Sequence, residues 1–301
     1  MNLLQERAAQ LLGKEAGLFV ASGTQSNLVA LLSHCQRGDE LLVGDCFHIH
    51  RYEAGGVSVL GGVMMGALAT DHRGVMRPSD ITAAIKPDDL HCPISRLLCL
   101  ENTVHGHAHD VEHINVLVAA AKARELLVHL DGARLMNASV KLGVPARIIV
   151  KAVDSVSLCL SKGLGAPAGS VLSGSRAFVD RARRMRKLVG GGMRQVGILA
   201  AAGLYALDHH IERLAVDHTN ALRLADQLYR INKVEVKKDL VETNMVFMKL
   251  PDGSAEPLRK YLSERGILLG GGERNIRLVT HLDIDVDAVD QLAIEINNFF
   301  G

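Results

Sequence analysis

The residue with the clearest chemical potential is Lys162, which follows the nearly apolar run at residues 157–160 and precedes a glycine-rich segment at residues 163–165. An apolar run of this kind is typical of a buried strand. Burial disfavours the charged form of an amine, and an uncharged lysine amine is a nucleophile toward carbonyl groups. We therefore interpret Lys162 as a Schiff-base lysine. The alternative is a lysine that has left the strand and points into water.

A carboxylate, Asp131, follows the preceding predicted strand, residues 126–130. The 31 positions from Asp131 to Lys162 suit a crossover between neighbouring parallel strands, whose carboxyl ends meet at one edge of a sheet. An acid and a Schiff-base lysine at one edge meet the needs of pyridoxal 5'-phosphate (PLP), because a buried carboxylate keeps the pyridine nitrogen protonated. Arg134 is then a donor to the phenolic oxygen, and the alternative is a local ion pair between Asp131 and Arg134.

A candidate phosphate cradle lies where a predicted strand is followed by Ser-Gly-Thr-Gln at the start of a helix. The backbone N–H groups of Gly23 and Thr24 and a hydroxyl would face an anion there. An ordinary helix N-cap is the alternative. Lys187 and Arg194 flank three glycines and are candidate phosphate contacts, including from a neighbouring subunit. The alternative for these two is a solvated basic turn.

Histidines supply further candidates. His48 follows the predicted strand at residues 40–43, so its imidazole can stack on the cofactor ring, although a lone histidine is also a common packed or surface residue. Residues 105–113 contain four histidines, the first three in alternation, which would align them on one side of a strand as metal ligands. No Asp, Glu or Cys set with a recognised spacing accompanies them, so we expect a polar loop and no metal site.

The first two thirds of the chain alternate between strand and helix patterns with short connections. This alternation predicts a mostly parallel, doubly wound α/β sheet flanked by helices. The predicted strands are residues 17–21, 40–43, 57–60, 96–100, 126–130 and 153–160, and the predicted helices are residues 3–12, 22–35, 76–85 and 111–124.

The pattern changes after residue 170. Three helices are predicted at residues 177–187, 195–209 and 211–229, followed by short strands at 244–250 and 275–279 and helices at 256–264 and 286–299. We therefore expect a large PLP-binding domain at residues 1–210 and a small C-terminal α+β domain at residues 211–301.

The composition excludes several classes of function. The chain has 301 residues with 34 basic and 33 acidic side chains, so it lacks the charge excess that nucleic acid or an anionic membrane would require. Five cysteines form no CxxC pair, which argues against a disulfide framework and favours a reducing, cytoplasmic compartment. We expect neither a signal peptide nor a membrane span.

A nicotinamide site is disfavoured, because the glycines at residues 163–169 have the wrong spacing and Pro167 interrupts the helix.

Five separated segments resemble the family of low-specificity L-threonine aldolases, PLP enzymes of fold type I with an aspartate-aminotransferase-like architecture. In the family's order they are residues 21–32 (ASGTQSNLVALL), 131–138 (DGARLMNA), 157–170 (SLCLSKGLGAPAGS), 190–197 (GGGMRQVG) and 277–283 (RLVTHLD). The resemblance runs from about Leu3 to the C-terminus. It implies a homodimer or homotetramer with shared active sites.

The resemblance also implies a role for each matching residue. Lys162 carries the cofactor, Asp131 contacts the pyridine nitrogen, and Arg134 contacts the phenolic oxygen. The other implied contacts are Gly23 and Thr24 in the phosphate loop, Ser161 beside the cofactor, Lys187 and Arg194 on the phosphate from the partner subunit, His48 stacked on the ring, and Arg277 on the substrate carboxylate.

Two departures from the family pattern affect the site. The family has an N-terminal arm with an Arg-Ser-Asp-Thr-like motif, and this chain starts after it, so either the sequence is incomplete or part of the site and of the dimer contact is missing. The family reads Glu-Asn-Thr-His after the fourth strand, whereas here Val104 separates Thr103 from His105. His105 is a candidate substitute near the substrate hydroxyl, although on an extended segment this shift would turn its side chain over.

The implied reaction is retro-aldol cleavage of L-threonine, L-allo-threonine and related β-hydroxy-α-amino acids to glycine and an aldehyde. The base that takes the hydroxyl proton is His48, His105 or a water molecule. Two alternatives remain: a PLP-binding but inactive homologue that lacks the arm, and another PLP-dependent reaction such as β-elimination or transamination. The preference between threonine and its allo epimer stays open.

Overall fold

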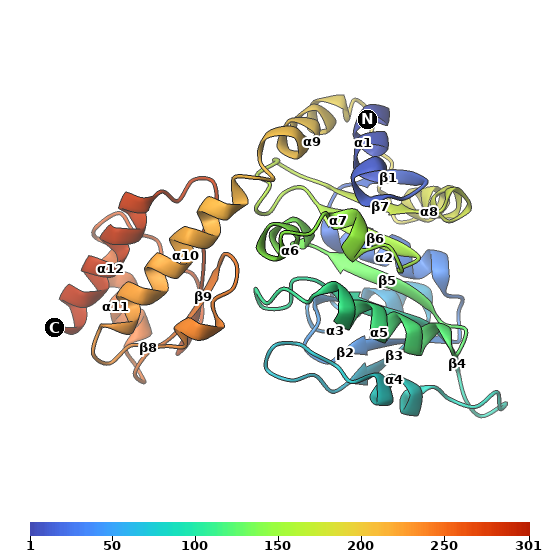
Figure 1. Cartoon of the computed structure of the whole chain (residues 1–301), viewed down its shortest axis with the longest axis horizontal. Coiled ribbons are helices and arrows are strands. Elements are labelled where there is room, and N and C mark those ends of the chain that lie inside the picture. The colour runs from blue at the N-terminus through green and yellow to red at the C-terminus, as the bar shows by residue number, and fades with distance from the viewer. The chain divides into compact units, whose positions relative to one another are not determined.

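The computed structural model describes residues 1–301, which form two compact units, Met1–Ile211 and Glu212–Gly301. In Figure 1 the first unit runs from blue to yellow and the second from orange to red. The first unit is built on a large sheet with helices on its faces, and the second on a small sheet with three helices.

The large sheet has seven strands in the order β1-β7-β6-β5-β4-β2-β3. Strands β3, β2, β4, β5 and β6 are parallel, whereas β7 is antiparallel to both β6 and β1. This confirms the predicted, mostly parallel α/β fold. The strand bounds are Ala16–Val20 (β1), Asp39–Gly44 (β2), Met64–Leu68 (β3), Ile94–Glu101 (β4), Leu127–Gly132 (β5), Ser155–Cys159 (β6) and Ser170–Gly174 (β7).

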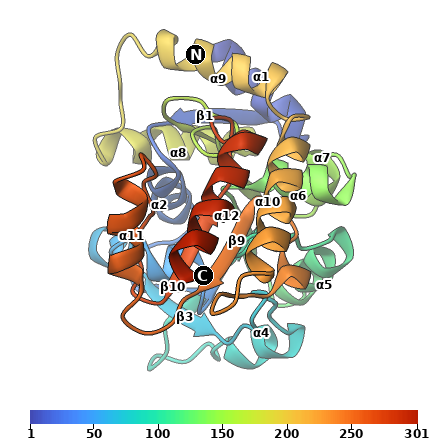
Figure 2. The same ribbon diagram turned by 90° about the vertical axis from the view of Figure 1, so that its left-hand side faces the viewer.

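Helices cover both faces of this sheet, so its central strands are buried along nearly their whole length. Figure 2 shows α2 and α8 on one side and α5, α6 and α7 on the other. The helices are Asn2–Leu12 (α1), Gly23–His34 (α2), His48–Arg51 (α3), Pro78–Ala84 (α4), Val111–Lys122 (α5), Leu135–Leu142 (α6), Ala146–Ile149 (α7), Arg176–Leu188 (α8) and Gly197–His209 (α9).

One predicted strand is wrong. Residues 57–60 belong to the π-helical turn η1 (Val57–Gly61), which ends at Gly62 with a left-handed φ of 63°. The edge strand is β3 instead, whose sequence Met-Met-Gly-Ala-Leu contains none of the β-branched residues that mark strands. Strand β7 is an addition to the prediction, because two serines and a glycine dilute its apolar pattern.

The second unit has its own core around a three-stranded antiparallel sheet in the order β10-β9-β8. Its buried side chains include Leu224, Val246, Leu258, Ile276 and Ile296. This is the predicted α+β arrangement. The elements are Leu214–Tyr229 (α10), Glu235–Val236 (β8), Lys238–Leu240 (η2), Met245–Lys249 (β9), Ala255–Ser263 (α11), Asn275–Val279 (β10) and Val286–Phe300 (α12).

None of the helices combines the length and the apolar character that crossing a membrane requires.

Candidate active site

The carboxyl ends of β4, β5 and β6 bring together Glu101, Asp131 and Lys162. Strand β5 ends with Asp131 and Gly132, and Lys162 lies three residues beyond the end of β6. The charges of Asp131, Lys162 and Arg134 all act on the carboxyl group of Glu101, so these groups surround one place. Lys162 is half-buried in a loop, rather than fully buried as the apolar run suggested, because the strand ends at Cys159.

Asp131 is buried and held by two hydrogen bonds. Its Oδ1 accepts from the backbone N–H of Ala133 at 2.9 Å, and its Oδ2 accepts from Nδ2 of Asn27 at 2.7 Å. Gly132 allows the chain to turn here, because a Cβ would come within 2.4 Å of the backbone oxygen of Ser157 on β6. Arg134 lies two residues after Gly132 and is half-buried at the N-cap of α6. The carboxylate therefore has a fixed orientation at the strand end.

A second acid, Glu53, which was not predicted from the sequence, contacts His48 and is joined to Asp131 through Asn27. Oε1 of Glu53 lies 2.9 Å from Nδ1 of His48 and accepts from Nδ2 of Asn27 at 2.8 Å. Burial raises the pKa of Glu53, and the bonds from His48 and Asn27 oppose that rise. The signal for Asn27 was a polar residue on the apolar face of α2, where it is 1% exposed.

Glu101 was also not among the predicted site residues, and its carboxyl group can hold a proton. Its Oε2 accepts the backbone N–H of His48 at 2.6 Å. Burial, aided by the charge of Asp131, raises the pKa of Glu101 to about 8, while the His48 N–H, Lys162 and Arg134 act in the opposite direction. The raised pKa favours the protonated form of Glu101.

The N-terminus of α2, predicted as an anion cradle or an ordinary N-cap, has the N-cap. Ser22 caps the helix, since its Oγ accepts from the N–H of Gln25 at 3.1 Å. Gly23 and Thr24 are the first two helical residues, so their N–H groups have no acceptor within the helix. Next to Gly23 lies Oγ of Ser170, a buried hydroxyl without a hydrogen-bond partner, 3.8 Å from the position of an added Cβ. These features fit a phosphate group.

The three-glycine segment after α8 lies against this helix start. A Cβ on Gly191 would come within 2.6 Å of the side-chain amide of Gln25. Lys187, in the last turn of α8, and Arg194 are both exposed. Ser161 is exposed as well, with its Oγ 3.5 Å from Sγ of Cys159. The structure thus brings the glycine segment to the cradle from the same chain.

His105 lies at the exposed tip of a tight turn, so the expected extended segment is wrong at this point. The backbones of Val104 and His107 bond to each other at 3.1 and 2.8 Å, and the two residues between them have left-handed φ angles of 50° and 86°.

The four histidines of residues 105–113 do not share one position. Nε2 of His109 lies 3.0 Å from the carbonyl oxygen of Arg73, and its ring meets that of His113 edge-on at 5.3 Å. The side chains whose potential ligand atoms come within 4.8 Å of one another are His48, Glu53 and Asp131 of the strand-end site. His48 contacts Glu53 directly, and Asn27 joins Glu53 to Asp131 through the hydrogen bonds described above.

Arg277 belongs to the second unit, where it lies on β10 with its side chain exposed. It pairs with Phe247 of β9 in the antiparallel ladder.

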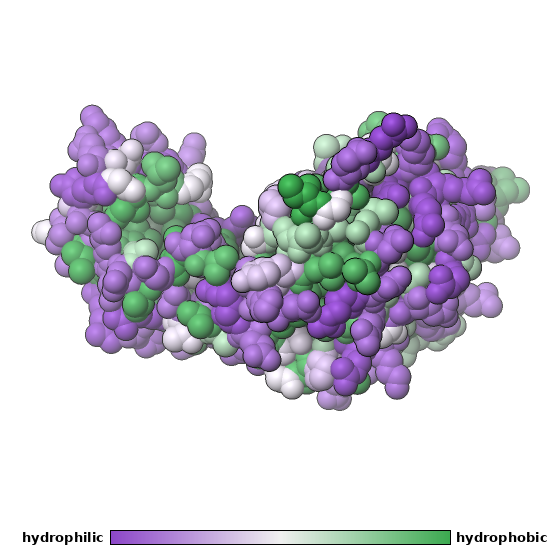
Figure 3. All heavy atoms as spheres, turned by 90° about the horizontal axis from the view of Figure 1, so that it is seen from above, coloured by the Kyte–Doolittle hydropathy of each residue, from purple (hydrophilic) through white to green (hydrophobic).

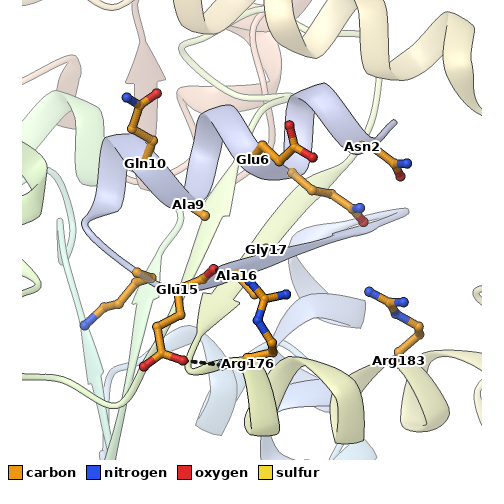
Figure 4. A pocket seen from close by; sticks show the side chains of 11 residues that line it. Asn2, Glu6, Ala9, Gln10, Glu15, Ala16, Gly17, Arg176 and Arg183 are labelled. Atoms are coloured by element: carbon orange, nitrogen blue, oxygen red, sulfur yellow. Dashed lines mark hydrogen bonds between the residues drawn. The ribbon is translucent and has the colours of Figure 1, made fainter.

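A separate polar cavity of about 500 Å³ lies among α1, β1 and α8 (Figure 4). Its lining includes Glu6, Glu15, Arg176 and Arg183, and the backbone N–H of Arg176 donates to Oε2 of Glu15 at 2.9 Å. None of the predicted site residues lines it. The candidate site is therefore the strand-end group.

Comparison with known proteins gives consistent results. Residues 1–251 match the model of the beta-eliminating lyase family. The chain is 47% identical to low-specificity L-threonine aldolase 1 of Arabidopsis thaliana, covering 95% of this chain and 83% of that protein. It is 43% identical to the low specificity L-threonine aldolase of Escherichia coli K12, covering 97% and 87%.

A solved structure of Leishmania major threonine aldolase has the same fold, with a TM-score of 0.81 at 19% identity over 99% of this chain and 89% of that one. The family match and the two close relatives cover most of the chain. The chain therefore belongs to the beta-eliminating lyase family and, within it, to the low-specificity L-threonine aldolases.

Proposed function

We propose that this protein is a PLP-dependent aldolase that cleaves L-threonine, L-allo-threonine and related β-hydroxy-α-amino acids to glycine and an aldehyde. The observation that carries the proposal is the arrangement of Asp131 and Lys162 at the carboxyl ends of neighbouring parallel strands. The N-terminus of α2 is the proposed anion cradle. The named activity of the relatives in plants and bacteria supports the same reaction.

The residues present fit PLP. Lys162 is the attachment point, Asp131 lies where a carboxylate must hold the pyridine nitrogen protonated, and Arg134 is the donor to the phenolic oxygen. Gly23 and Thr24 bind the phosphate with their N–H groups, and Ser161 completes the contacts. When bound, PLP supplies an electron sink for the pair of electrons released as the Cα–Cβ bond breaks.

The chain's own residues manage the proton and the substrate. Because Nδ1 of His48 is engaged with Glu53, a neutral His48 presents Nε2 as an acceptor and can take the substrate hydroxyl proton. His105, exposed at its turn tip, is the second candidate base. Arg277 is proposed to bind the substrate carboxylate, a task that suits the two-pronged guanidinium group.

We further propose a cytoplasmic homodimer or homotetramer in which the partner's Lys187 and the partner's Arg194 contact the phosphate. Large exposed apolar side chains on α1, α8 and α9 support association, since Leu3, Leu188 and Ile198 are 69%, 72% and 79% exposed. Figure 3, which looks onto α1 and α9, shows apolar side chains between polar ones on this face.

The test is product analysis with purified protein and PLP. We expect glycine and acetaldehyde from L-threonine and from L-allo-threonine, and a visible absorbance band from lysine-bound PLP. Lys162→Ala should lose the band and nearly all activity, because no other group in the site can attach the cofactor. The band without glycine would indicate the inactive homologue, and ammonia with a keto acid would indicate β-elimination; either result would contradict the proposal.

A further inference from the structure

A row of hydrogen-bonded polar side chains connects the far end of α2 with the candidate site. Nε2 of His34, in the last turn of α2, lies 2.7 Å from Oγ of Ser155 on β6. The same hydroxyl lies 2.8 Å from Nδ1 of His129 on β5, and Nε2 of His129 lies 3.2 Å from Oδ1 of Asn27. Asn27 then contacts Asp131. His129 and Ser155 are fully buried.

The donor and acceptor properties of these groups fix the direction of each hydrogen bond in the row. Oδ2 of Asp131 is an acceptor, so the end of the Asn27 amide that faces it is the NH2 group, and Oδ1 of Asn27 faces His129. His129 must therefore donate from Nε2 and accept at Nδ1, where the hydroxyl of Ser155 donates. The oxygen of Ser155 then accepts from Nε2–H of His34.

Both histidines are neutral in this environment. Burial lowers the pKa of His129 to about 3 and the pKa of His34 to about 4. The ring of His34 also stacks on Phe178 of α8, with ring centroids 4.5 Å apart. A neutral imidazole has one donor and one acceptor, so each ring can take only one tautomer in this row.

We propose that Asn27 is a positioning residue for both acids of the site and that the His34–Ser155–His129 relay fixes the orientation of its amide. One NH2 group donates to Asp131 at 2.7 Å and to Glu53 at 2.8 Å, and Glu53 in turn contacts His48. Asn27 thereby orients the acid for the ring nitrogen and, through Glu53, the imidazole for the ring face. The inference deepens the proposed function, since it depends on Asp131 and His48 serving PLP.

The first test reads the histidine tautomers directly in the protein without PLP or substrate. Long-range ¹H–¹⁵N NMR at neutral pH should show His129 and His34 as Nε2–H tautomers, with the signals assigned from His129→Asn and His34→Asn. In Asn27→Asp the new carboxylate still accepts from Nε2–H of His129, so His129 should keep the Nε2–H tautomer. An Nδ1–H tautomer or a protonated His129 in the unmodified protein would overturn the relay.

The second test measures PLP affinity by titration. Asn27→Asp matches the shape of Asn27 but adds a third acid beside Asp131 and Glu53 and cannot donate to both, so the dissociation constant for PLP should rise about tenfold or more. Ser155→Ala breaks the relay and should raise the dissociation constant for PLP on the order of fivefold. Ser173→Ala is the matched control, a buried hydroxyl on β7 without a partner, and should change nothing.

An unchanged PLP affinity in a folded Asn27→Asp variant, with folding checked by circular dichroism, would contradict the positioning role. Both readouts work without turnover. A failure of the proposed aldolase reaction is therefore distinguishable from a failure of this inference.

Discussion

At the scale of single residues, Glu101 has a carboxyl group held near three charged side chains, Asp131, Lys162 and Arg134. Its pKa of about 8 lies above the ordinary value of 4.5, so the folded protein keeps a proton that the unfolded chain releases between those two pH values. The stability contributed by this proton is full below pH 4.5 and is lost as the pH rises through about 8.

We therefore predict that the free energy of unfolding of the cofactor-free protein falls between pH 5 and pH 8 by on the order of 2 to 4 kcal/mol through this group. Glu101→Gln keeps the neutral form at every pH and should remove most of that fall. Urea unfolding at both pH values measures it. Equal pH dependence in the two proteins would show that Glu101 titrates normally.

His48 and His105 are the two candidate bases, and their different surroundings predict different effects of substitution. His48→Phe keeps a flat ring but loses Nε2 and the bond to Glu53, so kcat should fall about 10²-fold or more while PLP still binds. His105→Ala removes an exposed side chain at a turn tip, and kcat should stay within about threefold. A large loss in His105→Ala with an active His48→Phe would reverse the assignment.

At the scale of elements, the proposed anion cradle depends on how closely the glycine segment after α8 approaches α2. Alanine at position 191 would displace the Gln25 amide, whose Oε1 accepts from the N–H of Ala21 at 3.0 Å. We predict that Gly191→Ala weakens PLP binding about fivefold, through the loss of that hydrogen bond. Titration followed by visible absorbance measures it.

Gly197→Ala is the matched control for this element. A Cβ at position 197 meets nothing within 4 Å, and the residue begins α9, where alanine favours the helix. Its PLP affinity should equal that of the unmodified protein. If both variants bind equally well, the glycine segment does not support the cradle.

At the scale of the whole molecule, the proposed sharing of sites between subunits is testable by complementation. Lys162→Ala and Arg194→Ala should each be inactive, the second because an exposed arginine would serve the partner's phosphate. In a refolded equal mixture, each mixed dimer would contain one intact site, so activity should return to about one quarter of the unmodified level. No recovery in the mixture would place Arg194 in its own subunit's site.

The sequence by itself determined the residues that stand at strand ends. Lys162 and Asp131 were predictable because a buried strand has a continuous apolar pattern, and because parallel strands joined by a crossover end at one edge of the sheet. The cap at Ser22 was predictable for the same local reason, since a helix start has its own short signature.

Only the tertiary structure decided which polar groups complete the site. Asn27 meets Asp131 across 104 positions, and His48 meets Glu101 across 53, distances over which no local pattern carries information. The prediction also placed the edge strand at η1 instead of at β3, because an edge strand without β-branched residues lacks the sequence pattern typical of strands. Local periodicity fixes elements and their ends, whereas burial and hydrogen bonding between distant elements decide where Asn27, Glu53 and Glu101 lie and what they contact.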